Sequence, residues 1–376
     1  MTQKSLLVRD TAGSGKSTLL NRVLLDKCKD YSGNVSIIPI WLKAKDIDFK
    51  LNTPFIDYLI EVVAQQKGLS RDLQQQLYKA STEGKLSVLI DGLDEVPLDN
   101  RKIIADALDD ASIQRHNNQI ILASRPMGNI GINFPNAELE RFDLFSASFL
   151  VDKWKGYFDQ QGILNRDNNG DKLKALENAL NDAFNDSGAI SEILQTPLYL
   201  TYLIFNTISP EEDEQESSLL IKNETSLIKR TIEYVIPYWE EMKNGRILGQ
   251  GFLPSKYVAL KILWLTGFLL KKYPFSSKTD ILFRLQDESR AFFEGLSSAT
   301  LESGFNYWQE CNVFHIKDIN EAVSFWHAEI GEFCAAKYLC TEHGKKTVLS
   351  DKEMWETIRT DPDWANVKKF YIDLCE

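Results

Sequence analysis

Six consecutive residues near the start of the sequence have the types and the order of a phosphate-binding loop. They are Gly13, Ser14, Gly15, Lys16, Ser17 and Thr18, and they lie between a short apolar run at 5–8 and an apolar pattern with helical spacing. Glycines allow successive backbone N–H groups to point into one concavity, and a following helix adds the positive end of its dipole. The pattern predicts a site for the phosphates of a nucleoside triphosphate, formed by Thr11, Ala12 and these six residues.

Two side chains of this loop have specific roles in that prediction. Lys16 would reach the β and γ phosphates, and the hydroxyl of Ser17 would bind magnesium. Asp10 stands where the usual pattern has a glycine. Because aspartate tolerates unusual backbone angles better than most residues, we expect the turn to survive. We also expect the Asp10 carboxylate to point away from the phosphates and to weaken binding only modestly.

Three acidic residues follow the apolar run at 87–90, which reads as a buried strand. An acid at the end of such a strand is costly unless a cation meets it, so Asp91 is expected to hold magnesium directly or through water. Asp94 and Glu95 follow by about one helical turn, close enough to polarise a water molecule that attacks the γ phosphate. The sequence leaves open which of the two activates the water.

Arg125 comes two residues after the end of the next apolar run, at 119–123. An arginine at the carboxyl end of a strand can sense the γ phosphate and stabilise the charge that develops on it during transfer. In parallel sheets ligands bind beyond the carboxyl ends of the strands, so we expect Arg125, Asp91 and the phosphate loop to meet there.

These residues must be positioned by an α/β fold. Apolar runs alternate with stretches of helical spacing, which predicts a five-stranded parallel sheet covered on both faces. The runs are 5–8, 36–42, 87–90, 119–123 and 139–142. The sequence then becomes mostly helical, with stretches at 149–158, 173–184, 190–205, 219–242 and 253–308 and a small β signal at 313–316 and 322–326. We expect Trp154, Trp239, Trp264 and Trp308 to be core residues.

Composition excludes several other classes of protein. The 376 residues are too many for one core, and the net charge of −11 without a basic stripe argues against a nucleic-acid partner. Five cysteines without paired short spacings fit reduced thiols in the cytoplasm and indicate neither a disulfide framework nor a zinc site. The start of the sequence lacks a signal peptide. The longest apolar stretch, 258–270, is too short to span a membrane and is expected to be a buried helix.

Three motifs together resemble the NACHT domain of the signal-transducing P-loop ATPases called STAND proteins, which include the NLR-like defence proteins. They are AGSGKST, LIDGLDEVP and ILASRP, and an intervening strand between the loop strand and the acid strand is typical of AAA+ and related ATPases. Gly92, followed by the paired acids, separates this family from ATPases with a glutamate adjacent to the strand acid. The resemblance implies a P-loop nucleotide-binding domain (1–142), a helical domain (143–208), an acidic loop (209–218), a winged-helix domain (219–341) and the start of a helical sensor region (342–376).

Two downstream segments agree with this family. QTPLYL resembles its Pro-Leu helix start, which implies that Pro197 lies near the nucleotide base. FWHAEIGEFCAA resembles the end of its winged-helix domain, which implies that His327 contacts the β phosphate of ADP and holds the closed state. From the residues alone, His327 could equally be a helix cap or a core residue.

The resemblance implies a switch that binds ATP or ADP with Mg²⁺ and is a weak ATPase. The ADP form is a closed monomer, and the ATP form oligomerises with copies of itself to activate an effector, as in innate immunity or antiviral defence. Family members carry an effector before this core and a repeat sensor after it, so the sequence is expected to be a fragment or an incomplete gene model. The setting, whether antiviral defence, cell death or transcriptional control, stays open.

Other functions remain as alternatives. One is an AAA+-like remodelling ATPase with rapid turnover, which would need further arginines that the sequence does not identify. Another is a scaffold that binds nucleotide poorly because of Asp10. A GTPase is disfavoured because no Asn-Lys-x-Asp motif lies in the nucleotide domain, although ATP is preferred over GTP only by resemblance.

Overall fold

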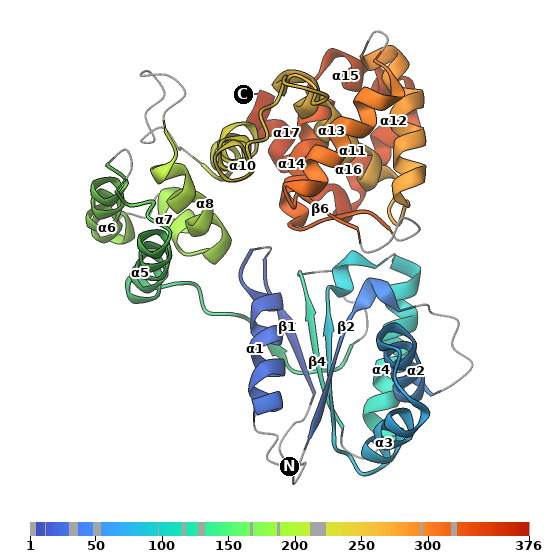
Figure 1. Ribbon diagram of the computed structural model, residues 1–376. Helices are drawn as coiled ribbons and strands as arrows, with labels where there is room; N and C mark the ends of the chain where they lie inside the picture. Colours follow the sequence, from blue (N-terminus) through green and yellow to red (C-terminus); the bar gives the residue numbers. More distant parts are fainter. Residues whose placement is uncertain are drawn as a thin grey trace. The chain divides into compact units, whose positions relative to one another are not determined.

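The chain folds into two compact units, 1–141 and 142–376 (Figure 1). This computed structural model describes residues 5–11, 13–29, 37–47, 54–96, 98–114, 118–126, 132–165, 168–185, 189–210, 223–293, 296–316 and 322–375. Ala12 and Pro97, both within the motifs above, lie outside these residues, as does 211–218 of the acidic loop.

The first unit is built on a five-stranded parallel sheet, as the sequence predicts. Its strands are β1 (Leu6–Arg9), β2 (Ile38–Lys43), β3 (Leu86–Asp91), β4 (Gln119–Ser124) and β5 (Asn136–Ala137). Their order across the sheet is β2-β3-β4-β1-β5, and every pair is parallel. In the sheet, β4 therefore lies between the loop strand β1 and the acid strand β3.

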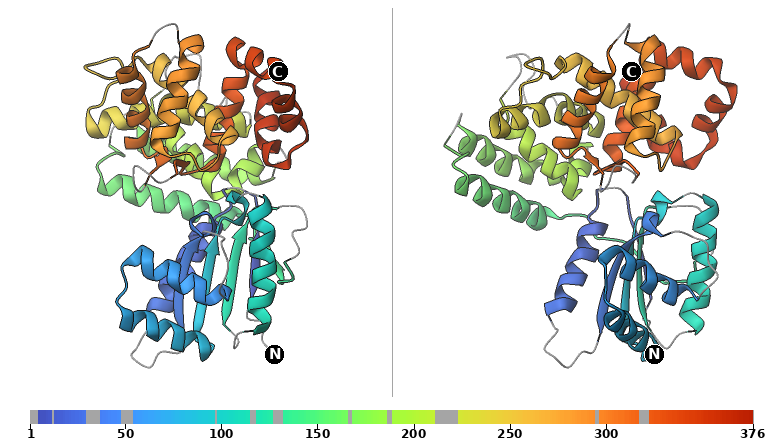
Figure 2. Two further views of the ribbon diagram at one scale, coloured as in Figure 1. Left: turned by 90° about the vertical axis from the view of Figure 1, so that its right-hand side faces the viewer. Right: turned by 45° about the vertical axis from the view of Figure 1, so that its right-hand side comes forward.

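Helices cover both faces of this sheet (Figures 1 and 2). The helices are α1 (Lys16–Lys29), α2 (Phe55–Lys67), α3 (Arg71–Thr82) and α4 (Leu98–Gln114). Successive strand residues point to opposite faces. Leu7 packs with residues of α2, α3 and α4, whereas Val8 packs with Leu20 of α1. Both faces of the sheet are buried, which explains why its strands read as continuous apolar runs.

The prediction of the fifth strand at 139–142 is wrong in position. The strand is Asn136–Ala137, whose residues pair with Leu7 and Val8, and the Leu7 N–H donates to the Pro135 carbonyl at 2.9 Å. The apolar residues that suggested 139–142 serve other purposes. Leu139 packs against the face covered by α1, and Phe142 packs into the core of the second unit.

The second unit begins with four helices around a small core. They are α5 (Leu144–Gln160), α6 (Asn169–Asn185), α7 (Ala189–Leu194) and α8 (Pro197–Ile208). The predicted helix at 190–205 is divided at Gln195 and Thr196, because Pro197 is the first residue of α8 and cannot donate a backbone hydrogen bond. Trp154 and Trp239 are partly buried in this core, as expected.

The next part of the chain is also helical. It consists of α9 (Glu224–Arg230), a π-helical turn η4 (Thr231–Val235), α10 (Ile236–Asn244), α11 (Lys256–Lys272), α12 (Lys278–Phe292) and α13 (Ser298–Glu310). A hairpin of β6 (Phe314–His315) and β7 (Ser324–Phe325) follows, and Ser277 pairs with Ala322. The hairpin thus follows three helices, and the two β signals of the sequence are confirmed.

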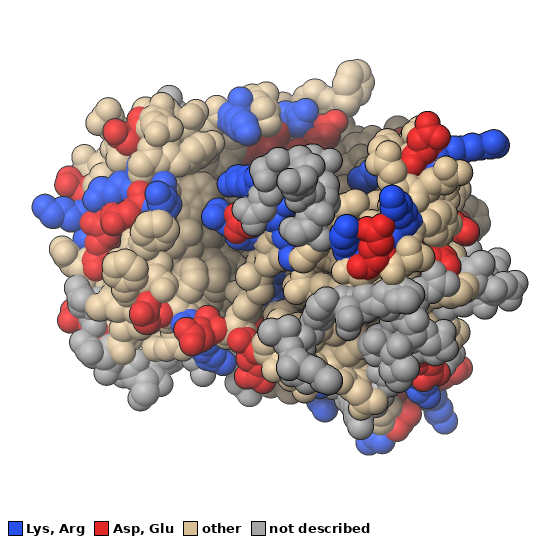
Figure 3. Space-filling model, turned by 90° about the horizontal axis from the view of Figure 1, so that it is seen from below, with Lys and Arg blue, Asp and Glu red and all other residues tan. Residues whose placement is uncertain are grey.

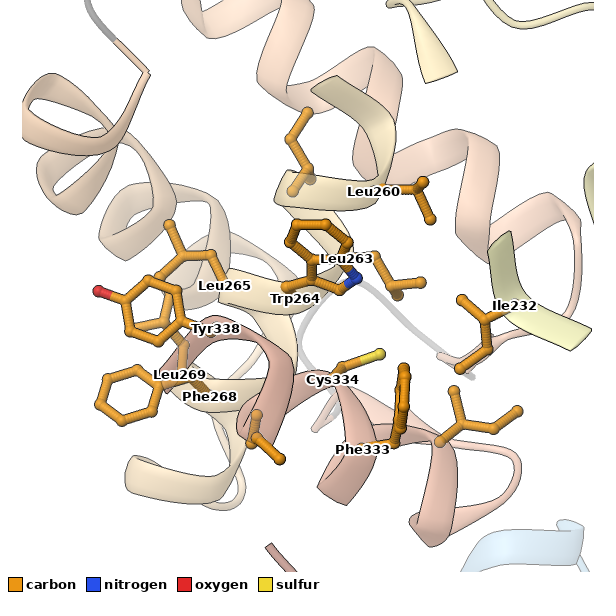
Figure 4. Close-up of a cluster of buried hydrophobic side chains, with 14 of the residues drawn as sticks. Ile232, Leu260, Leu263, Trp264, Leu265, Phe268, Leu269, Phe333, Cys334 and Tyr338 are labelled. Carbon is orange, nitrogen blue, oxygen red and sulfur yellow. The ribbon is translucent and has the colours of Figure 1, made fainter. Parts of the chain in front are cut away.

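The core of this unit lies between α11 and α14 (Ala328–Leu339) (Figure 4). Nearly every residue of α11 from Ala259 to Leu269 is buried, so the predicted buried helix at 258–270 is confirmed. Trp264 and Trp308 belong to the same core. Three helices complete the unit: α15 (Glu342–Ser350), α16 (Lys352–Thr360) and α17 (Ala365–Cys375).

Candidate functional site

The phosphate loop connects β1 to α1, and its conformation depends on two glycines. Gly13 has φ of 73° and Gly15 has φ of 100°, which are backbone angles that other residues rarely adopt. Helix α1 begins at Lys16, and the Leu19 N–H donates to the Gly15 carbonyl at 2.8 Å. Ser17 and Thr18 lie in the first turn, so the positive end of the helix dipole meets the loop.

The Lys16 side chain folds back over this loop. Its Nζ donates to the carbonyl oxygens of Asp10 at 2.8 Å and Thr11 at 2.6 Å, and it lies 3.4 Å from the Ser14 hydroxyl. The ammonium group is therefore held at the loop itself, where a phosphate group bound by the loop would meet it.

Asp10 fits the loop for a different reason from the one expected. Its φ is negative, so the position does not require the conformational freedom of glycine. Its Oδ1 accepts from the Thr11 N–H at 2.6 Å and from the Thr11 hydroxyl at 3.2 Å, while its own N–H donates to the Ser124 carbonyl at 3.3 Å. The Asp10 carboxylate is thus satisfied within the loop.

The two predicted magnesium ligands lie together. Ser17, at the start of α1, lies near enough to the carboxylate of Asp91, at the end of β3, to influence its pKa. Burial raises the pKa of Asp91, while the Ser17 side chain and the charges of Lys43 and Lys16 oppose this. Carboxylate and hydroxyl oxygens suit Mg²⁺, and a divalent cation there would favour the ionised form of Asp91. The donor set fits the metal.

Asp94 and Arg125 form a close pair. The Arg125 Nε lies 3.2 Å from Asp94 Oδ2, and the Arg125 backbone N–H donates to Asp94 Oδ1 at 2.9 Å. The two side chains are only 19% and 16% exposed, so water screens this pair weakly. Both oxygens of Asp94 are therefore engaged by the arginine that follows β4.

Glu95 is held differently. Its Oε2 lies 3.6 Å from Nζ of Lys45, in the turn after β2. Burial raises the pKa of Glu95 and the Lys45 charge opposes this, although the Glu95 side chain remains 47% exposed. Gly92 has φ of 76°, and a Cβ atom there would approach the Glu95 Cδ to 3.1 Å. The glycine therefore leaves room for Glu95 to fold back toward the strand.

Four further residues contribute to the site: three lie outside the sequence motifs, and Ser124 lies within ILASRP but had no predicted role. Lys43 pairs with Asp91 in the register of β2 and β3, and Lys45 follows it. Ser124 lies beside Asp94, with 3.5 Å between Oγ and Oδ1, and the buried Arg101 donates from Nη2 to the Asp94 carbonyl at 2.7 Å. The two lysines could have been found as a basic pair ending a predicted strand. Ser124 and Arg101 carry no such signal.

Pro197 and His327 belong to the second unit. Pro197 begins α8, and His327 is the residue before α14, at its N-terminal end. Desolvation lowers the pKa of His327. Its ring lies edge-on to the ring of Tyr202 of α8, with 6.1 Å between the centroids. The helix that Pro197 begins and the histidine are therefore neighbours within this unit.

Two other kinds of site were sought among the described residues, a metal centre and a membrane-spanning helix. The described Lys and Arg side chains are interspersed with Asp and Glu on the face drawn in Figure 3. Over the described ranges, no group of three or more His, Cys, Asp or Glu side chains could hold a metal ion. No helix of those ranges is long and apolar enough to cross a membrane.

This arrangement is that of a P-loop NTPase. The loop after β1, Asp91 at the end of β3 and Arg125 after the intervening β4 lie at the carboxyl edge of one parallel sheet, which is where ligands bind in sheets of this kind. The strand order and the loop after β1 define the fold.

No protein-family model matches the chain, and no curated protein matches it. Among solved structures it is similar to a STAND protein with a tetratricopeptide repeat sensor from Pyrococcus horikoshii, with 11% identity and a TM-score of 0.39 over 100% of this chain and 46% of that one. It is also similar to the ORC1 protein of Aeropyrum pernix in complex with DNA, with 12% identity and a TM-score of 0.35 over 87% of this chain and 85% of that one. A third similar structure is Drosophila ORC bound to DNA, with 12% identity and a TM-score of 0.35 over 90% of this chain and 91% of that one. The chain thus spans less than half the length of the Pyrococcus horikoshii protein.

Proposed function

We propose that this chain is the nucleotide-dependent core of a signalling switch of the NACHT type, which binds ATP or ADP with Mg²⁺ and hydrolyses ATP slowly. The observation that carries the nucleotide chemistry is the proximity of Ser17 and Asp91, because it brings together two predicted magnesium ligands from distant parts of the sequence. Lys16 beside the loop supports the same site.

The switch is supported by the residues around His327. His327 is exposed at the surface of its unit, but desolvation lowers its pKa, so the ring is neutral at neutral pH and can donate one hydrogen bond to a phosphate oxygen. We propose that His327 and Pro197 contact ADP in the closed state, and that ATP favours an oligomer that activates an effector. A nucleotide moves this equilibrium only by its differential affinity for the two states.

Within the ATPase site we assign to Glu95 the activation of the water molecule that attacks the γ phosphate. Asp94 has both oxygens engaged by Arg125, so its role is to position that arginine for the γ phosphate. Glu95 has one ion pair, and burial raises its pKa, which makes the carboxylate a better proton acceptor and suits a general base.

The most informative test is the nucleotide that the protein carries when it is purified. We expect mass analysis of released ligand to find ADP with the native chain and little with Lys16→Ala, because the variant loses a charge-assisted contact worth about 1.5–3 kcal/mol. Added ADP should also raise the melting temperature of the native chain alone. A native chain that neither carries nucleotide nor gains stability from it would favour a scaffold impaired at Asp10.

His327→Ala tests the switch separately from the phosphate loop. We expect ADP to bind about tenfold more weakly and the oligomeric fraction to rise, since one hydrogen bond of the closed state is lost. Calorimetry and light scattering would measure the two effects. Unchanged ADP affinity together with an unchanged oligomeric state would refute the role of His327.

A remodelling ATPase of the AAA+ type is the second candidate, because the strand order is shared. Brisk steady-state hydrolysis would favour it, and near-silent turnover with bound ADP would favour the switch. The two ORC proteins were solved in complex with DNA. Helix α13, in the position of a winged helix's recognition helix, carries Glu302 and Glu310 and no lysine or arginine.

A further inference from the structure

Two cysteines that are far apart in the sequence meet in the second unit. Cys340 ends α14 as its C-cap residue, and Cys375 is the last residue of α17. Both are free thiols, and their Sγ atoms lie 3.4 Å apart. Cys375 is exposed and Cys340 is partly buried. The sequence does not predict this pair, because its cysteines show no paired short spacing.

The two sulfur atoms are placed by packing between their helices. The rings of Phe333 on α14 and Phe370 on α17 lie 6.0 Å apart, and Asn366 of α17 donates to Glu332 of α14 at 3.1 Å. A disulfide requires about 2.05 Å between the sulfur atoms, so side-chain rotation has to close a gap of roughly 1.4 Å. The helices themselves need not separate.

We propose that Cys340 and Cys375 are an oxidative modification site, which a peroxide converts to an intramolecular disulfide. The Cys375 sulfur attacks one oxygen of hydrogen peroxide, which forms a sulfenic acid and releases water. The Cys340 sulfur then attacks the Cys375 sulfur, the S–O bond breaks, and the hydroxyl leaves as a second water with the Cys340 proton. The two thiols lose two electrons and the peroxide gains them.

The environment of the pair sets the order of these steps. Burial and the hydrogen bond with Cys375 raise the pKa of Cys340 to about 12, so this thiol keeps its proton at neutral pH. Because the thiolate is the reactive form, Cys340 is a poor first target for peroxide. The exposed Cys375 therefore reacts first, and the Cys340 sulfur, 3.4 Å away, is placed to displace the hydroxyl of the sulfenic acid as the Cys340 proton leaves with it.

The bond would join the ends of α14 and α17 and enclose α15 and α16 in a covalent loop. Closing such a loop restricts the unfolded chain more than the folded one. We expect amide hydrogen exchange in α17 to slow by roughly tenfold or more after oxidation. This inference does not depend on the proposed binding of a nucleotide.

The test is to treat the full chain with dilute hydrogen peroxide, block the remaining thiols with an alkylating reagent and digest with trypsin without reduction. Cleavage after Lys337, Lys345 and Lys369 separates the two cysteines into different peptides. We expect one linked pair, which dithiothreitol separates. Cys340→Ala and Cys375→Ser should abolish it, whereas Cys28→Ser, an exposed cysteine of the first unit, should leave it intact.

Hydrogen exchange of each variant verifies that α14 and α17 are still folded, so a lost link is not a consequence of unfolding. The proposal is wrong if both cysteines are recovered as thiols or as separate sulfinic acids under conditions that oxidise Cys28. It is also wrong if Cys375 instead links two chains, which electrophoresis without reductant would detect.

Discussion

Gly15 of the first unit is required for its backbone angle, whereas Gly267 of the second unit is required for the space that it leaves. A Cβ atom on Gly15 would meet nothing within 4 Å, yet its φ of 100° excludes most residues. A Cβ atom on Gly267 would lie 2.6 Å from Cβ of Cys334 and 2.8 Å from the Gly331 carbonyl oxygen. The first glycine shapes a binding loop, and the second lets α11 approach α14.

The charged residues of the two units show the same contrast between residues placed for binding and residues placed for packing. At the edge of the sheet, Lys16, Asp91, Asp94, Glu95 and Arg125 gather around one place where a ligand can bind. In the second unit, Glu332 links helices, with Lys271 of α11 at 3.2 Å and Asn366 of α17 at 3.1 Å. The comparison implies that substitutions in the first set change chemistry, whereas substitutions around α14 change folding.

The largest expected effect is on hydrolysis. Glu95→Gln should lower the rate of hydrolysis of bound ATP by about 100-fold or more, because it removes the proposed general base, while nucleotide affinity stays close to native. Asp94→Asn is the matched variant, and a smaller loss is expected because it disturbs only the position of Arg125. Single-turnover measurements give both rates. A greater loss for Asp94→Asn would exchange the two roles.

The next effect is on stability. Gly267→Ala should reduce the free energy of unfolding of the second unit by about 1–3 kcal/mol, because the added methyl group overpacks the contact with Cys334. Gly156→Ala in α5 is the control, since its Cβ would meet nothing within 4 Å and alanine favours a helix by up to about 1 kcal/mol. Chemical denaturation measures both. Equal stability of the two variants would contradict the close approach of α11 and α14.

The smallest effect concerns pH. Glu95 can accept a proton only when ionised, so hydrolysis falls as the pH falls through its pKa, which burial raises and the Lys45 charge lowers. Lys45→Met removes that charge and should move the acid limb of the pH–rate profile to higher pH. Lys85→Met, from an exposed pair with Glu83, is the control and should leave the limb in place. If the Lys45 variant also left it in place, Glu95 would not be the titrating base.

Much of the first unit could be predicted because its signals are local. The glycine pattern of the loop and the acid ending a buried strand are each contained in a few consecutive residues, and four strands lie within two residues of their expected bounds. The fifth strand was misplaced because β5 is short and polar and is defined by its backbone pairing with β1. Apolar content carries no information about such a strand.

The sequence predicted which residues belong to the candidate site better than it predicted which of them are in contact. That Asp94 would meet Arg125 depends on the placement of β4 beside β3, and Lys45 reaches Glu95 because β2 pairs with β3. Similarly, the meeting of Cys340 and Cys375 depends on the packing of α14 against α17. Such relations arise from tertiary structure and leave no pattern in a single sequence.

The short strand β5 has a mechanical consequence. The chain leaves the first unit through Asn136–Ala137, which pair with Leu7 and Val8 of β1, and then continues into α5. Tension applied through the helices would act first on this two-residue pairing and on the Leu7 N–H bond to Pro135. This force would be transmitted to β1. Because β1 leads directly into the phosphate loop, a force on the helices of the second unit would be transmitted through β1 to the loop.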